Sequence, residues 1–133
     1  VFLSSIVAFQ GVPRAANYAA SKAYVQSLAE ALALELRPHG VDVLASAPGP
    51  VASGFAARAG MDLGRAADPA TVAAATVRAL GRGSTVRPGL MAKLFGYSLA
   101  SAPRALRVRI MAAIMAGMTR DAAGGASHTR GLP

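Results

Sequence analysis

The segment from Ala16 to Arg37 constrains the fold of this chain most, because it is the longest stretch with a single helical pattern. Apolar residues recur along it at spacings of three and four, in one row with Lys22. The members of this row are Tyr18, Val25, Ala29, Leu32 and Leu36. Pro38 and Gly40 follow, and both residue types commonly end helices. We therefore expect one amphipathic helix that stops at Arg37.

Two short apolar runs, residues 1–4 and 41–47, lie on either side of this helix. Neither alternates strictly between apolar and polar residues, which is typical of parallel strands that are covered on both faces. A strand–helix–strand unit of this length predicts two parallel strands joined by a right-handed crossover. A second helix beginning at Pro69 and an edge strand at 84–86 continue the α/β pattern.

Tyr18 and Lys22 are four residues apart, so a helix places them one above the other on the same face. The ammonium favours the phenolate form of the tyrosine, which suits a general acid or base. Ser5 precedes Tyr18 by thirteen residues. A loop that brings Ser5 alongside would add a hydroxyl for a substrate oxygen. These three residues are the catalytic candidates.

The segment closely resembles the active-site segment of short-chain dehydrogenases/reductases, in Ser4-Ser5, Gly11 and Tyr18-Ala-Ala-Ser-Lys22. The resemblance implies a Rossmann-type, doubly wound parallel sheet, of which this chain has the last three strands with their helices and additional C-terminal helices. It also implies an NAD(P)-dependent enzyme that interconverts a carbonyl and a secondary alcohol. Tyr18 would exchange the proton, Lys22 would bind the nicotinamide ribose as well, and Ser5 would polarise the carbonyl.

The loop Pro48-Gly49-Pro50-Val51-Ala52-Ser53 follows the strand at 41–47. Ligands of open α/β sheets bind beyond the carboxyl ends of the strands, so this loop is well placed to contact one. It resembles the family's Pro-Gly-x-Val-x-Thr segment, with a serine in place of threonine. The resemblance implies that Pro48, Gly49, Val51 and Ser53 border the nicotinamide, with the Val51 backbone as a partner for the carboxamide.

The family's glycine-rich cofactor loop does not occur in these 133 residues. We therefore expect residues 1–121 to be the C-terminal part of one NAD(P)-binding domain, and 122–133 to be a disordered tail. The choice between NAD and NADP depends on residues of the other part. We expect the isolated chain to be inactive and the full-length protein to be a homo-oligomer. The alternative function is an inactive remnant that serves as an interaction or membrane-surface module.

The net charge of +8 comes entirely from residues 64–133, since residues 1–63 are balanced. Aromatic residues make up only 5% and no nucleic-acid motif is present, so nucleic acid is the least expected partner. With no cysteine and two distant histidines, we expect no metal site. No export signal or membrane span is recognisable, and we expect a cytoplasmic protein that acts on a small carbonyl or alcohol.

Two segments have more than one interpretation. Phe55, Met61 and Leu63 either line a substrate pocket or fold their loop onto the core. From Leu90 to about Arg120 we expect two helices divided at Pro103. The second has an apolar stripe with Arg104 and Arg107 beside it and Arg109 further round. It suits packing over the substrate entrance, packing against a second subunit, or weak contact with an anionic membrane. The stripe consists of Leu106, Ile110, Met111, Ile114, Met115 and Met118.

Overall fold

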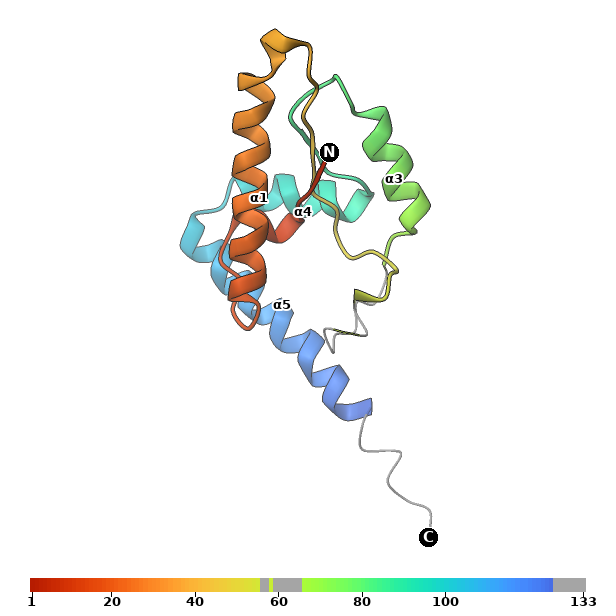
Figure 1. Ribbon diagram of the computed structural model, residues 1–133. Coiled ribbons are helices and arrows are strands. Elements are labelled where there is room, and N and C mark those ends of the chain that lie inside the picture. The colour runs from red at the N-terminus through yellow and green to blue at the C-terminus, as the bar shows by residue number, and fades with distance from the viewer. Residues whose placement is uncertain (56–57, 59–65, 126–133) are drawn as a thin grey trace.

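The computed structural model describes residues 1–55, 58 and 66–125. Its centre is a three-stranded parallel sheet, as predicted, and the strand order is β1-β2-β3. The strands are β1 (Phe2–Leu3), β2 (Ala45–Ser46) and β3 (Thr85–Val86). Helices lie to either side of the sheet, with α1 on one side and α3 on the other (Figure 1). The α/β class and the parallel crossover are both confirmed.

Helix α1 (Ala16–Glu35) is the crossover between β1 and β2. Its fully buried residues are Ala19, Gln26 and Ala29, and the other members of the predicted apolar row are half-buried. Two of the three buried residues are alanines, so the helix backbone approaches the sheet closely. The helix ends at Glu35, two residues before the predicted Arg37, and is followed by the short 3-10 helix η2 (Arg37–His39) and then Gly40, whose φ of 72° is left-handed.

Strand β2 lies in the middle of the sheet and is the most buried part of the chain. Leu44, Ala45, Ser46 and Ala47 are all at most 1% exposed. The paired strand is shorter than the predicted 41–47, because β1 and β3 each pair with it over two residues only. Val41 lies outside that pairing and is 47% exposed.

Helix α3 (Pro69–Arg78) begins at a cap that the sequence predicts. The Asp68 carboxylate accepts hydrogen bonds from the backbone N–H and the hydroxyl of Thr71, at 2.8 and 2.9 Å. These bonds lower the pKa of Asp68, the backbone bond most strongly. The helix is held to the sheet by a buried contact of 2.8 Å between the hydroxyls of Thr76 and Ser46.

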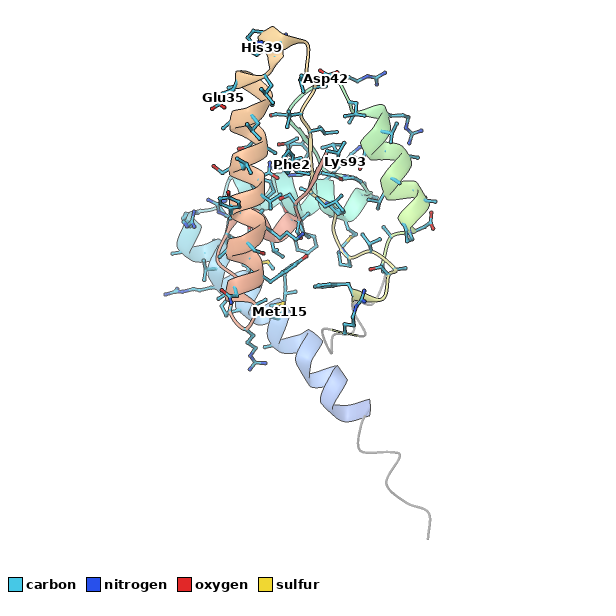
Figure 2. The ribbon with its side chains drawn as sticks, in the orientation of Figure 1. Phe2, Glu35, His39, Asp42, Lys93 and Met115 are labelled. Atoms are coloured by element: carbon cyan, nitrogen blue, oxygen red, sulfur yellow. The ribbon has the colours of Figure 1, made fainter. Side chains whose placement is uncertain are left out.

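Helices α4 (Leu90–Ala100) and α5 (Arg104–Gly125) are separated near Pro103, as predicted. The first half of α5 packs against the beginning of α1, where Met111 and Met115 form a cluster with Val12 and Ala19 (Figure 2). Met111 and Met115 of the predicted apolar stripe are therefore buried, whereas Leu106 at its start is 47% exposed. Helix α5 continues to Gly125, which takes in four residues of the segment predicted as a tail.

None of the described helices is long and apolar enough to cross a membrane.

Candidate active site

The site is built at the carboxyl end of β1, where Ser4 and Ser5 are both buried. Ser5 caps the 3-10 helix η1 (Ile6–Phe9), because its Oγ accepts a hydrogen bond from the Val7 N–H at 3.4 Å. A hydroxyl carries one donor and two acceptor sites. The hydrogen of the Ser5 hydroxyl is therefore still available for a ligand.

Tyr18 and Lys22 occupy successive turns at the start of α1, and both are half-buried. The Lys22 Nζ lies 5.7 Å from the centre of the Tyr18 ring, so the helical spacing does bring phenol and ammonium together. The same Nζ donates to the Leu3 carbonyl at 2.9 Å, and the Ser4 hydroxyl donates to the Lys22 carbonyl at 3.3 Å. These two bonds attach the start of α1 to the end of β1.

The loop after β2 lies against the same edge. The Ile6 N–H donates to the Pro48 carbonyl at 3.1 Å. A Cβ on Gly49 would contact the Ile6 side chain at 3.8 Å and Ala92 of α4 at 3.9 Å. The loop thus packs between η1 and α4, and its Pro48 and Gly49 lie beside the residue that follows Ser5.

Val51 pairs with Ala67 in an isolated parallel bridge, but the hydrogen bonds of this bridge are formed by Pro50 and Ala52, the residues on either side of Val51. Ala67 donates to the Pro50 carbonyl at 2.8 Å and accepts from the Ala52 N–H at 2.9 Å. Among the described residues, no hydrogen bond uses the N–H or the C=O of Val51. Both groups are available to a ligand. The Ser53 Oγ accepts from the Phe55 N–H at 3.4 Å, which leaves its hydrogen available too.

Phe55 is the one residue of the suggested pocket lining that the structure describes. Its ring centre lies 5.3 Å from that of Tyr18, with the ring planes tilted by 32°. Since Phe55 is 42% exposed, it forms a wall beside Tyr18 and is not buried in the core. Met61 and Leu63, the other two suggested residues, lie outside the described residues.

The sequence pattern did not indicate the bond between Lys22 and Leu3, because it joins residues nineteen positions apart. The sequence pattern also did not indicate whether His39 lies close enough to Tyr18 to take part in proton transfer. His39 follows the last turn of α1, at the opposite end from Tyr18 (Figure 2). A helix of 20 residues is about 30 Å long, so His39 is too far away to exchange a proton at this site.

Within the described ranges, no group of three His, Cys, Asp or Glu side chains lies close enough together to hold a metal ion. The chemistry that the arrangement offers is acid–base and hydrogen-bonding chemistry. It consists of the phenol of Tyr18, the ammonium of Lys22 and the hydroxyl groups of Ser5 and Ser53.

Residues 1–63 match the short chain dehydrogenase family. A search of curated proteins gives no match. The fold is similar to solved structures of larger proteins. One is a short-chain dehydrogenase from Burkholderia cenocepacia in complex with NADP, with a TM-score of 0.69 and 28% identity. That similarity covers 82% of this chain and 45% of the other.

A short-chain dehydrogenase from Sphingobium yanoikuyae in complex with NADPH is also similar, with a TM-score of 0.60 and 28% identity over 78% of this chain and 42% of the other. A 7beta-hydroxysteroid dehydrogenase has the same fold, with a TM-score of 0.69 at 23% identity, over 82% of this chain and 44% of the other. The chain thus spans less than half the length of the structures that it matches.

Proposed function

We propose that the chain belongs to the short-chain dehydrogenase/reductase family and that it supplies the catalytic residues of an NAD(P)-dependent oxidoreductase. The proposed reaction interconverts a carbonyl and a secondary alcohol by hydride transfer. One observation carries the proposal. The Tyr18 phenol and the Lys22 ammonium, 5.7 Å from the ring centre, are held at the end of the strand that leads into Ser5.

In the direction of reduction, the Tyr18 hydroxyl donates its proton to the carbonyl oxygen of the substrate, and in oxidation it takes the proton back. The Lys22 ammonium stabilises the phenolate that remains, since opposite charges attract more strongly in a half-buried site than in bulk water. The Ser5 hydroxyl donates to the same substrate oxygen and stabilises its developing negative charge.

The residues after β2 fit a nicotinamide. The free N–H and C=O of Val51 match the acceptor and donor of a carboxamide. Lys22 has three N–H donors and uses one on Leu3, so two remain for the ribose hydroxyls. The bound cofactor would supply or accept the hydride. Two of the similar structures contain NADP or NADPH, and we propose NAD or NADP here.

We also propose that residues 1–121 act as the C-terminal part of one NAD(P)-binding domain. In the part of the chain that the structure describes, β1 has a strand partner on one side only, and Leu3 of β1 is 65% exposed. A further parallel strand would cover this edge. The coverage of 45% of the Burkholderia cenocepacia protein agrees with such an arrangement.

The test is the oxidation of NADPH and NADH with a panel of ketones. It is run on this chain alone and on a fusion with the cofactor-binding part of the Burkholderia cenocepacia enzyme. Tyr18→Phe removes the acid without removing the ring, and we expect it to lower kcat by about 10²-fold or more. The control is Tyr24→Phe, because Tyr24 lies on the same helix but is 68% exposed. Full activity of Tyr18→Phe would refute the proposed role.

A second candidate function, a membrane-surface module, is favoured by α4 and not by α5. Leu90, Leu94 and Tyr97 follow the helical spacing on α4 and are 81%, 60% and 70% exposed. The exposed Lys93 lies beside this row (Figure 2). We expect anionic vesicles to bind this surface if the second candidate holds. No turnover in the chain or the fusion, together with vesicle binding, would favour this function over the first.

A further inference from the structure

A cavity of about 70 Å³ lies between η1, α4 and α5, and two arginines form part of its wall. Arg87 comes directly after β3, and Arg107 lies in the first turn of α5. Phe9 and Gln10 contribute to the wall from η1 and its cap, and Gly96 contributes from α4. Neither Tyr18 nor Lys22 lines this cavity. It is therefore separate from the proposed catalytic residues.

Arg87 is held in the wall by aromatic rings. Its guanidinium carbon lies 4.4 Å from the centre of the Phe9 ring and 5.9 Å from that of Tyr97. Its side chain also crosses α4 at Gly96. A Cβ at this glycine would lie 2.6 Å from Arg87 Cδ and 2.8 Å from Nε. A glycine inside a helix costs about 1 kcal/mol relative to alanine, and here it provides the space that the arginine occupies.

Arg107 contacts Phe9 as well, at its backbone. Its Nη1 donates to the Phe9 carbonyl at 3.3 Å. Two guanidinium groups thus converge on Phe9, one at its ring and one at its backbone. Both are half-buried, and the Nε of each is buried without a hydrogen-bond partner.

Neither positive charge is balanced nearby. Residues 69–120 contain eight Lys or Arg and no Asp or Glu. Among the described residues, these two guanidinium groups contact Phe9 and Tyr97 and form no ion pair. Two like charges that line one partly dehydrated cavity repel each other, and buried N–H donors without partners cost free energy. A bound anion would remove both penalties.

We propose that this cavity binds a compact oxyanion, a phosphate or carboxylate group, between Arg87 and Arg107. Guanidinium groups present paired N–H donors that match the oxygens of such groups. A cavity of about 70 Å³ holds one group of this size, since a water molecule takes about 30 Å³ of the liquid. The inference does not rest on the oxidoreductase function, because binding is measured without turnover.

Sodium phosphate and sodium acetate, titrated into the full chain at constant ionic strength against chloride, test the site. Isothermal titration calorimetry measures the affinity, and we expect saturable binding of one anion per chain. Arg87→Gln and Arg107→Gln should each weaken it by about tenfold or more, because a hydrogen bond to a charged group contributes about 1.5–3 kcal/mol. Arg109→Gln is the control, since Arg109 is exposed on the same helix as Arg107. Stronger binding of phosphate than of acetate identifies a phosphate site, and the reverse identifies a carboxylate site.

Gly96→Ala is the second variant, and it keeps both positive charges. The new methyl group forces Arg87 to move, while alanine favours the helix. We therefore expect weaker anion binding without loss of α4 helicity by circular dichroism. The proposal is overturned if phosphate and acetate bind no better than chloride, or if Arg109→Gln weakens binding as much as Arg87→Gln and Arg107→Gln. It is also overturned if Gly96→Ala binds the anion with unchanged affinity.

Discussion

Asp68 shows how a single side chain ties helix formation to pH. Its carboxylate satisfies the backbone N–H of Thr71, one of the donors that has no partner within the helix. Because the charged carboxylate is the better acceptor, the pKa of Asp68 is lowered in the folded chain. A lowered pKa stabilises the fold at pH values above the pKa of the unfolded chain, about 3.9. That contribution is lost as pH falls through the folded pKa.

We therefore expect the stability of Asp68→Ala to fall below that of the natural chain near neutral pH, and the two to converge as pH falls below about 4. Urea denaturation at a series of pH values measures this difference. Asp68→Asn is the matched control, since asparagine also caps helices but does not titrate. It should retain most of the stability at pH 7 without the Asp68 contribution to the pH dependence. A constant gap between Asp68→Ala and the natural chain from pH 7 to pH 2 would contradict the assignment.

At the scale of elements, α3 is joined to the central strand by one buried pair of hydroxyl groups. Thr76 Oγ1 donates to the Val72 carbonyl at 2.8 Å, which uses its only hydrogen. Ser46 must then be the donor in its 2.8 Å contact with Thr76. Both residues are buried, at 0% and 6% exposure. The strand therefore donates to the helix, and the Ser46 hydroxyl depends on Thr76 for its acceptor.

Thr76→Val keeps the shape of the side chain but leaves the Ser46 hydroxyl without its acceptor. We expect it to lower the free energy of unfolding by about 1–3 kcal/mol, the cost of an unsatisfied buried polar group. Val77→Thr, on the exposed face of the same helix, should change it by less than about 0.5 kcal/mol. The double variant Ser46→Ala/Thr76→Val should lose less than the sum of its single variants, as urea denaturation of all four chains would show. Simple additivity would mean that the two hydroxyls act independently.

At the scale of the whole molecule, apolar exposure and positive charge occur on the same part of the chain. The row Leu90, Leu94 and Tyr97 lies on α4, within residues 69–120, where every charged residue is basic. Helix α5 was the other candidate for a membrane-facing stripe, but its Met111 and Met115 are packed against α1. A helix with exposed apolar residues and basic neighbours suits an anionic bilayer surface.

Leu94→Ser should reduce co-sedimentation of the full chain with vesicles that contain phosphatidylserine, because it removes one of the apolar contacts with the bilayer. Leu34→Ser is the matched control, since Leu34 is 73% exposed on α1, away from this row. Raising the salt concentration should weaken binding as well, because it screens the attraction of the basic residues. Equal binding to neutral phosphatidylcholine vesicles, or an equal effect of Leu34→Ser, would exclude α4 as a membrane-binding surface.

Local spacing was sufficient to predict much of the architecture. The four-residue interval between Tyr18 and Lys22 places both on one face of any helix. Asp68 and Pro69 are residue types favoured at the cap and the first position of a helix, so they indicate a helix start. Long-range pairing was not predictable in the same way. Gln26 is an example: its Nε2 donates to Thr85 and to Glu30, both at 2.7 Å, and so joins α1 to β3. Nothing in the local sequence around Gln26 indicates a partner 59 residues away.

The sequence by itself determined the helices, the parallel sheet and the placement of Tyr18 and Lys22 on one helix face. The reason is that the backbone geometry of a helix or strand fixes which residues share a face from their spacing alone. Only the tertiary structure decided which faces are buried. It buried Met111 and Met115 of α5, left the row on α4 outside, and brought Arg87 and Arg107 together at Phe9. The physical reason is that burial depends on which elements pack together. Packing is settled by contacts between residues far apart in the chain, which no local pattern records.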